Sequence, residues 1–235
     1  MLGVYISGLK RNTGKSVIAG GFLGTMQSLG YRTGYYKPIM TGSGNDFCDA
    51  KFINRIDSNI ITLTSYNFPN AVQPLIGAYE AGIKKIDIPS LIMDYRRISN
   101  NSEFSIVEGC NSIASPIDEK KTEISLINQF GLPLILVVDP TINTLDEVIQ
   151  GVNYIYTNRT KLMGIIVNNY DKNSENLEHK YFPQLIKEFT SVKIIGEFRH
   201  YENLQNLAPE SLIADTLNRF NLEEIFGLRI AKLVK

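Results

Sequence analysis

The chain has 235 residues, 43% of them hydrophobic, which is enough for one well-buried core and short for two independent ones. Lysine plus arginine equals aspartate plus glutamate at 24 each, so no overall field attracts nucleic acid and we expect no nucleic-acid partner. Two isolated cysteines, Cys48 and Cys110, and two histidines argue against a disulfide framework or a zinc site. We therefore predict a single cytoplasmic domain over residues 1–235.

Short apolar runs bounded by turn residues, most of them rich in valine and isoleucine, recur along the chain and predict buried parallel strands. They are Leu2–Ser7, Thr33–Tyr36, Phe104–Val107, Pro133–Val138, Met163–Val167 and Val192–Ile195. Between them, amphipathic stretches at Lys15–Leu29, which Gly30 ends, and at Leu145–Tyr156 predict helices. This alternation predicts a doubly wound α/β fold, a mostly parallel sheet with helices on both faces.

The segment from Ser43 to Ser102 is less regular. Short helices are expected at Phe47–Ile56, Pro74–Ala81 and Ser90–Arg97, separated by loops containing asparagine, proline and serine. Loops of this length beside a nucleotide site often shape the pocket of a second substrate.

The C-terminal part, from Leu212 to Lys235, predicts one or two amphipathic helices. Its last stretch, Ile225 to Lys235, is basic enough to resemble a helix on a membrane surface. We favour a helix packed on the sheet and expect no stable membrane association. No apolar run approaches the ~20 residues of a membrane span, and the order of residues after Met1 does not fit a signal peptide.

The loop from Gly8 to Ser16, Gly-Leu-Lys-Arg-Asn-Thr-Gly-Lys-Ser, follows the first strand and opens the first helix. Backbone N–H groups and a helix N-terminus therefore converge on one point with positive partial charge. Lys15 adds a full charge, and Ser16 offers a hydroxyl to Mg²⁺. The gap between Gly8 and Gly14 is one residue longer than the standard motif, so the surrounding strand and helix carry the prediction that this loop binds the phosphates of ATP. An ordinary strand-to-helix turn is the alternative.

The second predicted strand leads into Lys37-Pro38-Ile39-Met40-Thr41-Gly42, so a lysine and a hydroxyl lie at the edge of the sheet where open α/β folds bind ligands. We expect Pro38 to stop the strand and turn the chain outward. Lys37 is then either a solvated edge charge that supports no core packing or a cation for phosphoryl transfer. Its place beside the phosphate loop favours the second interpretation.

Two carboxylates come from neighbouring parts of the predicted sheet. Glu108 follows the strand that ends at Val107, and Asp49 lies early in the irregular segment. With Ser16 they supply the few oxygen ligands that Mg²⁺ usually takes from protein. The alternatives are a helix N-cap or surface charge for Glu108 and a helix-start residue for Asp49.

These residues resemble the motifs of the dethiobiotin synthetase family, and the resemblance covers most of the chain. The family loop G-T-D-T-x-V-G-K-T is similar to Gly8–Ser16, with Thr13 in place of the valine, and its K-P-x-x-[ST]-G element to Lys37–Gly42. Further matches are Asp49-Ala50, Gln73-Pro74-Leu75-Ile76, Val107–Ser112 for V-E-G-A-G-G, Pro140–Thr144 for G-x-I-N-H, Gly164–Asn168 for G-x-x-x-N and Gly196-Glu197-Phe198 for G-E-x-P. Related P-loop ATPases share several of these motifs, so their order and spacing carry the resemblance.

The resemblance implies a P-loop NTPase fold and an ATP-dependent ligase that acts as a homodimer with its substrate at the subunit interface. CO₂ would add to an amine of 7,8-diaminopelargonate as a carbamate, whose oxygen would take the γ-phosphoryl group of ATP. The second amine would then close the ring. The products would be dethiobiotin, ADP and phosphate.

The resemblance also implies roles for individual residues. The catalytic residues would be Lys15, Lys37 and Thr41, and the Mg²⁺ ligands Ser16, Asp49 and Glu108. ATP would be bound by Gly8, Asn12, Thr13, Gly14, Lys15, Ser16, Asn168, which would read adenine, and Glu197. The second substrate would be bound by Lys10, Arg11, Thr41, Glu108, Cys110, Asn111, Thr141 and Asn143.

The chain departs from the family in two places. Leu9-Lys10-Arg11-Asn12 replaces small polar and acidic residues, and Cys110-Asn111-Ser112 replaces a glycine-rich stretch. Two added cations disfavour a diamine and favour a carboxylate or carbamate, so the second substrate stays open between a diamine and a carboxylate. An ATP-dependent amidoligase resembling the cobyrinic acid diamide synthases is one alternative. Lys10, five residues before Lys15, matches the extra lysine of MinD/ParA-type switch ATPases, which is another.

Overall fold

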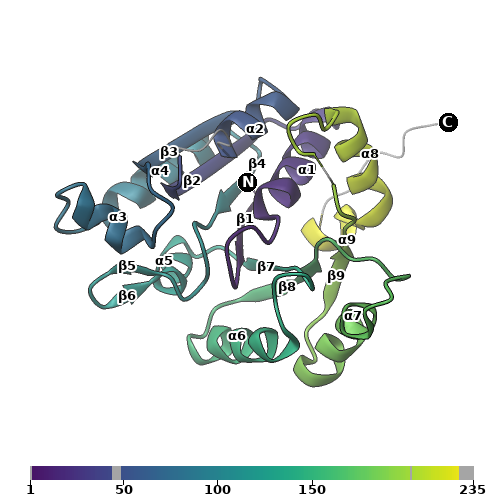
Figure 1. Ribbon diagram of the computed structural model, residues 1–235. Coiled ribbons are helices and arrows are strands. Elements are labelled where there is room, and N and C mark those ends of the chain that lie inside the picture. The colour runs from purple at the N-terminus through teal and green to yellow at the C-terminus, as the bar shows by residue number, and fades with distance from the viewer. Residues whose placement is uncertain (1, 44–48, 202, 228–235) are drawn as a thin grey trace.

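A parallel sheet of seven strands forms the centre of the protein (Figure 1). The computed structural model describes residues 2–43, 49–201 and 203–227. Within them the strand order is β3-β2-β4-β1-β7-β8-β9, and every neighbouring pair is parallel. The strands are β1 (Leu2–Gly8), β2 (Thr33–Thr41), β3 (Ile61–Phe68), β4 (Phe104–Glu108), β7 (Leu134–Val138), β8 (Leu162–Val167) and β9 (Ile194–Glu197).

Helices connect these strands and cover the sheet. They are α1 (Lys15–Ser28), α2 (Asp49–Ile56), α3 (Pro74–Glu80), α4 (Ile88–Asn100), α5 (Glu123–Phe130), α6 (Leu145–Thr157), α7 (Leu177–Thr190), α8 (Pro209–Arg219) and α9 (Leu222–Phe226). A small antiparallel hairpin, β5 (Pro116–Asp118) and β6 (Lys121–Thr122), precedes α5.

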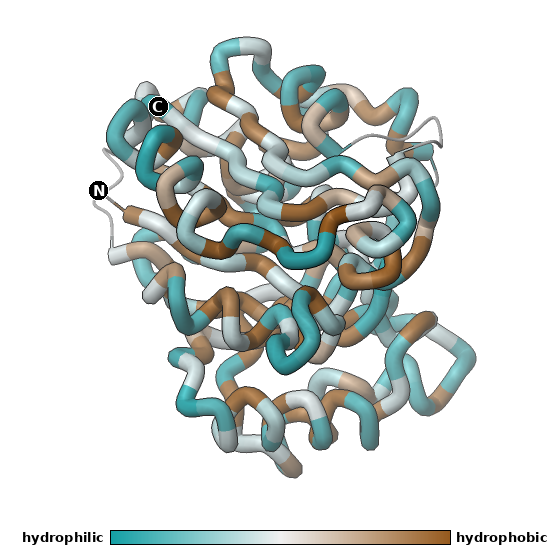
Figure 2. The backbone as a smooth tube through the Cα atoms, turned by 90° about the vertical axis from the view of Figure 1, so that its left-hand side faces the viewer, coloured by the Kyte–Doolittle hydropathy of each residue, from teal (hydrophilic) through white to brown (hydrophobic). Residues whose placement is uncertain are grey.

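Alternate side chains of the strands point to opposite faces, so each face has its own core. Val4 and Ile6 of β1 pack with α1, α2, α8 and α9 on one face, whereas Tyr5 packs with α4, α5, α6 and α7 on the other. Figure 2 shows hydrophobic stretches along the inner segments and hydrophilic turns towards the outside. This arrangement confirms the predicted doubly wound fold with helices on both faces.

The central strand β1 fixes the position of the phosphate loop. It pairs with β4 on one side and β7 on the other. Strands β2, β3 and β4 therefore lie to one side of β1, and β7, β8 and β9 lie to the other, so the loop after β1 leaves the sheet where the strand order reverses. In open α/β sheets this switch point is where ligands bind.

Two predictions about the second strand and the segment after it were wrong. Strand β3 (Ile61–Phe68) lies inside the segment expected to be irregular, and β2 continues through Pro38 to Thr41. Beyond Tyr36, β2 pairs with β3 but no longer with β4. Pro38 thus falls where one side of β2 has no described partner strand, and its missing N–H interrupts no ladder there.

Most of the remaining elements were predicted closely. The other five predicted strands and the two longest predicted helices agree with the structure to within two residues at either end. Of the three short helices, the first is observed as α2 from Asp49, with residues 47–48 outside the described part, the second as α3, and the third is longer than expected as α4. The hairpin β5–β6 and the helices α5 and α7 were not predicted.

The C-terminal helices α8 and α9 pack onto α1, and they confirm the helices predicted between Leu212 and Phe226, whereas the packing expected for Ile225 to Lys235 concerns mostly residues outside the described part. The ring centroid of Phe226 lies 5.2 Å from that of Phe22 in α1 and 5.0 Å from that of Phe104 in β4, in edge-to-face geometry. Phe220 lies 4.9 Å from Phe22. Residues 228–235 lie outside the described part. No helix in the described residues is both long enough and apolar enough to cross a membrane.

We expect Phe226→Ala to lower the free energy of unfolding by about 3–5 kcal/mol, because the buried ring would leave a cavity against Phe22 and Phe104. Urea unfolding followed by circular dichroism measures the change. The matched control is Phe189→Ala on α7, where the ring is 65% exposed and a change within about 0.5 kcal/mol is expected. Equal stability of the two variants would contradict the packing of α9 as part of the core.

Candidate active site

The phosphate loop is shaped by residues in the left-handed region. Asn12 has φ 59° and Gly14 has φ 88°. A Cβ atom on Gly14 would lie 2.0 Å from Nδ2 of Asn168, so only glycine fits there. Asn168, just after β8, donates from Nδ2 to the carbonyl of Thr13 at 3.1 Å and so holds the backbone of the loop in place.

Lys15 is held inside the site by neutral groups. Its Nζ donates to the carbonyl of Lys10 at 2.9 Å and to the carbonyl of Asn111 at 3.2 Å, and the residue is 5% exposed. Burial lowers the pKa of Lys15, and the nearby charge of Lys37 lowers it further. An ammonium whose partners among the described residues are carbonyls gains most from an arriving anion, which is what binding of a phosphate requires.

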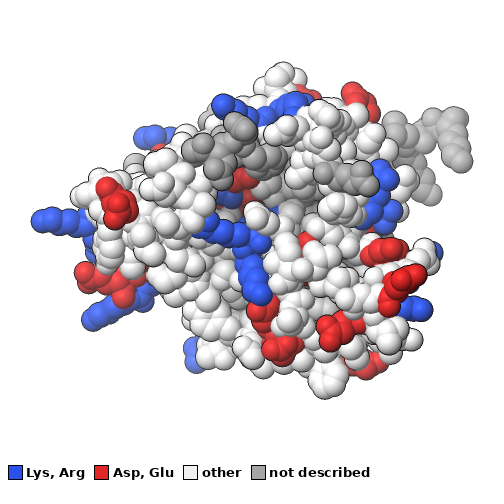
Figure 3. All heavy atoms as spheres, viewed as in Figure 1, with Lys and Arg blue, Asp and Glu red and all other residues white. Residues whose placement is uncertain are grey.

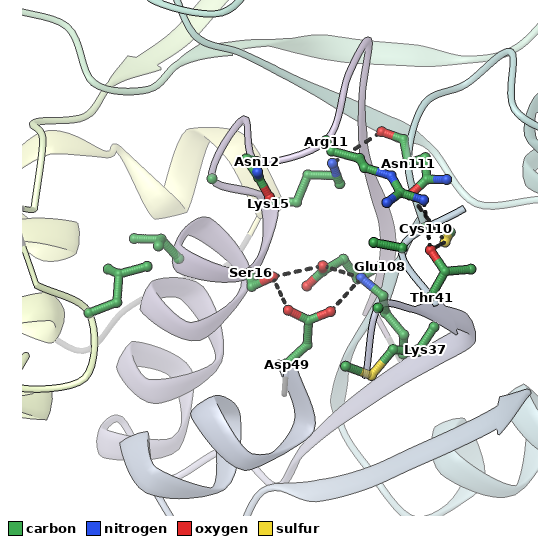
Figure 4. A pocket seen from close by; sticks show the side chains of 16 residues that line it. Arg11, Asn12, Lys15, Ser16, Lys37, Thr41, Asp49, Glu108, Cys110 and Asn111 are labelled. Atoms are coloured by element: carbon green, nitrogen blue, oxygen red, sulfur yellow. Dashed lines mark hydrogen bonds and ion pairs between the residues drawn. The ribbon is translucent and has the colours of Figure 1, made fainter. Parts of the chain in front are cut away.

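Four polar side chains from four elements meet beside this loop (Figure 4). Ser16 Oγ in α1 lies within hydrogen-bonding distance of Asp49 Oδ1 (2.7 Å) and Glu108 Oε1 (2.9 Å). Lys37 Nζ in β2 contacts Glu108 Oε1 at 2.6 Å and Asp49 Oδ2 at 2.8 Å. Tyr35 donates to the other oxygen of Glu108 at 2.9 Å. We call Ser16, Lys37, Asp49 and Glu108 the charge cluster.

The burial of the charge cluster corrects two alternatives. Lys37 is 3% exposed and Glu108 is 0% exposed, so neither is a solvated surface charge, and Lys37 does belong to a packed interior. Asp49 is the first residue of α2, which confirms the helix-start interpretation, and its role as a metal ligand stays a prediction. The partners of Lys37 lie far from it in the sequence, which is why the sequence did not indicate its burial.

The ionisation of the charge cluster follows from its geometry. Burial raises the pKa of Glu108, and the charge of Lys37 only partly offsets this. Burial also raises the pKa of Asp49, but the charge of Lys37 and hydrogen bonds from Lys37 and Ser16 outweigh it, so that pKa is lowered overall. For Lys37, burial lowers the pKa but the two carboxylates raise it more, so Lys37 stays charged.

The donor set of the charge cluster fits Mg²⁺. A serine hydroxyl and two carboxylates converge within hydrogen-bond distance, and hard oxygen ligands are what this ion prefers. No group of three or more histidine, cysteine, aspartate or glutamate side chains suited to a metal occurs in the described residues. A site with so few protein ligands suits an ion that completes its shell with water and phosphate oxygens.

The phosphate loop and the charge cluster open into one cavity of about 430 Å³. In the space-filling view, basic side chains lie beside acidic ones in a hollow in the middle of this face (Figure 3). The cavity continues past Lys15 to a second half lined by Arg11, Thr41, Cys110 and Asn111. Thr41 Oγ1 and Cys110 Sγ lie 3.5 Å apart there, and burial raises the pKa of the Cys110 thiol.

Several predicted site residues do not line this cavity. Lys10 Nζ donates to the carbonyl of Ile142 at 3.1 Å and pairs with Glu147 of α6 at 2.6 Å. Thr141 and Asn143 hydrogen-bond to Asp139, Thr141 through its N–H and hydroxyl to the carboxylate and Asn143 through its side-chain oxygen to the backbone N–H. Their proposed contacts with substrate stay predictions.

The ATP contacts predicted for Glu197, Gly8, Thr13 and Asn168 also stay predictions. Glu197 is exposed at the end of β9 and lines a different hollow, together with Lys187, Lys193 and Arg219. Gly8 and Thr13 belong to the phosphate loop but are not among the residues that line the cavity, and Asn168 donates a hydrogen bond to the loop backbone. The side-chain oxygen of Asn168 is buried with no hydrogen-bond partner in the described part of the chain.

Sequence reasoning missed Glu123, a buried carboxyl at the start of α5 that is 1% exposed. Glu123 accepts hydrogen bonds from Ser7 Oγ at 2.5 Å and from the N–H of Cys110 at 2.9 Å. Burial raises the pKa of Glu123. A Cβ on Gly109 would lie 2.0 Å from its Oε1, so glycine is required there. Glu123 thus fixes the segment that carries Cys110 and Asn111, and no motif in its own neighbourhood indicated this role.

A protein-family model described as an AAA domain, AAA_26, matches residues 2–208. Curated relatives named ATP-dependent dethiobiotin synthetase come from several bacteria. The one from Clostridium acetobutylicum is 27% identical, with 97% of this chain and 98% of the relative covered. The one from Caldicellulosiruptor saccharolyticus is 29% identical over 84% of both chains.

Solved structures share the fold at low sequence identity. The MinC:MinD cell division protein complex of Aquifex aeolicus and an ATP complex of a Cyanothece McdA variant each match with a TM-score of 0.61 at 13% identity, covering 100% of this chain and 99% of the matched chain. MinD with Mg-ADP from Pyrococcus horikoshii matches with a TM-score of 0.53 at 13% identity, covering 92% of this chain and 93% of that one. These likenesses confirm the predicted P-loop NTPase type of fold.

We expect Lys37→Met to destabilise the protein more at pH 8 than at pH 5. Without the cation, the pKa of Glu108 would lie further above its unfolded value of about 4.3. A carboxyl whose pKa is raised in the folded state costs stability above the unfolded pKa, and this cost grows as the pH rises towards the folded value. The loss at pH 8 should reach about 3–5 kcal/mol, measured by urea unfolding at both pH values.

The control for this prediction is the double variant Lys37→Met/Glu108→Gln. It also removes the carboxylate of Glu108 and leaves Asp49 as the carboxylate that has lost its cation, so its stability relative to wild type should vary less between pH 5 and pH 8 than that of Lys37→Met. A loss in Lys37→Met that is the same at both pH values would contradict the ionised pairing of Lys37 with Glu108.

Proposed function

The chain belongs to the AAA domain family represented by the AAA_26 model, and from this premise we propose that it is an ATP-dependent ligase of the dethiobiotin synthetase kind. The proposed reaction is the carboxylation of 7,8-diaminopelargonate with CO₂ and its closure to the cyclic urea dethiobiotin. ATP is consumed, and ADP and phosphate are released. Mg²⁺ is the proposed metal.

One observation carries this proposal: residues of the phosphate loop and of the charge cluster line a single cavity, whose second half has room for another substrate. A triphosphate bound at Lys15 would direct its γ-phosphate towards Lys37 and Thr41. An acceptor in the second half of the cavity would then lie next to the transferred group. Phosphoryl transfer depends mainly on such positioning and on cations that offset developing charge.

In the proposed reaction an oxygen of the carbamate attacks the γ-phosphorus, and the bond from that phosphorus to the β,γ-bridging oxygen breaks, releasing ADP. The second amine then attacks the carbamoyl carbon, phosphate leaves, and the amine gives up a proton to water. Lys15 and Lys37 would stabilise the phosphoryl oxygens, and Thr41 would orient the carbamate. Mg²⁺ held by Ser16, Asp49 and Glu108 would neutralise charge on the phosphates.

The chain's own geometry gives less support to a switch ATPase. Lys10, the residue that suggested this alternative, is paired with Glu147 and bonded to the Ile142 carbonyl of its own chain. The likeness to MinD and McdA, at 13% identity, concerns the fold.

A homodimer with the second substrate near the subunit interface remains part of our proposal, and sedimentation with and without nucleotide tests it.

We expect ADP release only when ATP, Mg²⁺, 7,8-diaminopelargonate and bicarbonate are all present, in a coupled assay that varies each component. Lys15→Ala should reduce turnover by about 10²–10³-fold, because it removes a charge directed at the phosphates. Lys180→Ala on the exposed face of α7 is the matched lysine control and should behave like wild type.

Other results would favour the alternatives. Dimer formation on ATP alone, with no substrate-dependent turnover, would support the switch ATPase. ADP release that needs a carboxylate and an amine donor, with none from diaminopelargonate and bicarbonate, would support the amidoligase and would rule out our assignment.

A further inference from the structure

Strand β9 (Ile194–Glu197) lies at one end of the sheet. It pairs with β8 on one side, with Ile165 opposite Ile194 and Val167 opposite Glu197, and no strand of the described residues pairs with its other side. The free side of an edge strand leaves backbone N–H and C=O groups unpaired, and these groups are a template for pairing with another extended chain. The sheet can therefore accept a further strand next to β9.

A hollow of about 830 Å³, which we call the β9 groove, follows this free edge. All five residues from Lys193 to Glu197 line the groove and no residue of β8 does, so the groove lies on the unpaired side of β9. Pro183 and Gln184 of α7 line it as well, and Figure 1 shows β9 next to α7. Ile194 and Ile195 are half-buried and contribute apolar surface.

The β9 groove carries more positive than negative charge. Its described lining holds three cations, Lys187, Lys193 and Arg219, and one carboxylate, that of Glu197. Lys193 pairs with Glu224 of α9, whereas Lys187 and Arg219 are exposed and form no ion pair or side-chain hydrogen bond with any residue that the structure describes. Burial raises the pKa of Glu197, and the charge of Arg219 offsets this only in part. Two cations of the groove are therefore open to an anionic partner.

Two occupants from this protein itself do not complement that charge. Residues 228–235, which lie outside the described part, carry three cations and no acidic residue, so their charge has the same sign as that of the groove. A second copy that paired β9 edge to edge would bring the cations of two grooves together, and like charges facing each other across an interface disfavour it. The charge of the groove thus favours an acidic partner.

We propose that the β9 groove binds an extended acidic segment of a partner protein, which adds to β9 as a further strand and places its carboxylates beside Lys187 and Arg219. In this mode of recognition, main-chain hydrogen bonds to the edge strand supply affinity and the side chains select the partner. Lys187 comes from α7 and Arg219 from the end of α8, so acidic side chains on both faces of the added strand are matched.

The inference goes beyond the proposed function and does not depend on it. No described residue lines both the β9 groove and the cavity that contains the phosphate loop. A partner seated on β9 would therefore leave the described lining of that cavity uncovered.

The test is a fluorescence anisotropy titration of labelled peptides with the full chain at constant ionic strength. The acidic probe is the capped peptide Glu-Glu-Val-Thr-Val-Glu-Glu, which presents carboxylates on both faces of a strand. The second probe has lysine in place of each glutamate. The third has proline in place of threonine, which keeps the charge but removes a backbone N–H and disfavours strand pairing.

The groove variant is Lys187→Glu/Arg219→Glu. The matched control is Lys172→Glu/Arg96→Glu, which makes the same change of charge at exposed residues outside the groove. Circular dichroism checks that both variants are folded. The comparison of the three peptides on the wild type needs no variant.

We expect the acidic peptide to bind the wild type and the control more tightly than the groove variant, by at least about tenfold relative to the wild type, because two attractions become repulsions. The lysine peptide should prefer the groove variant. The proline peptide should bind the wild type at least about tenfold more weakly than the acidic peptide, since strand pairing is lost.

Three results would overturn the inference. They are no binding of the acidic peptide to the wild type, equal binding by the groove variant and the control, and equal binding of the acidic and proline peptides, which would mean attraction by charge without strand addition. Sedimentation of the wild type without peptide gives a fourth: self-association that the groove variant abolishes would make a second copy the occupant of the groove.

Discussion

The contact of Lys37 with the buried carboxylate of Glu108 and the half-buried carboxylate of Asp49 joins elements of the protein at one point. Lys37 comes from β2, Glu108 from β4 and Asp49 from α2, and Ser16 of α1 contacts both carboxylates. A buried ion without its counterion costs several kcal/mol, so none of these charges is stable at this depth alone. The packing of the four elements and the ionisation of the charge cluster therefore depend on each other, and the charge cluster belongs to the core as well as to the site.

On the opposite face of the sheet, a second buried carboxyl group, that of Glu123, holds neighbouring segments together. Glu123 accepts from Ser7 at the end of β1 and from the backbone of Cys110 just after β4, while Glu108 is the last residue of β4. Glu123 thus holds the loop after β4, and Glu108 faces the phosphate loop. Because the Asn111 carbonyl in that loop accepts from Lys15, the position of Lys15 depends on both sides of the sheet.

The sequence predicts the sheet well where strands are fully buried, since runs such as Leu134–Val138 have no polar alternative to the interior. It does not predict β3, an edge strand whose threonine, serine and asparagine residues alternate with apolar ones and resemble a loop. The phosphate loop and the magnesium-type donor set were predicted because local motifs define them. The burial of Lys37 and the role of Glu123 were not, because their partners are contributed by distant segments that only the folded chain brings together.

The two cations in the segment Leu9 to Asn12 of the phosphate loop do not act on the same site. Lys10 and Arg11 are adjacent and equal in charge, and in the sequence they add two cations to the same site. In the structure Lys10 turns towards α6 and is neutralised by Glu147, whose carboxylate also accepts from the N–H of Thr144 at the start of that helix. Arg11 turns the other way, into the cavity, where its described partners are uncharged. The extra charge that the loop brings to the cavity is therefore that of Arg11 and not the sum of the two cations.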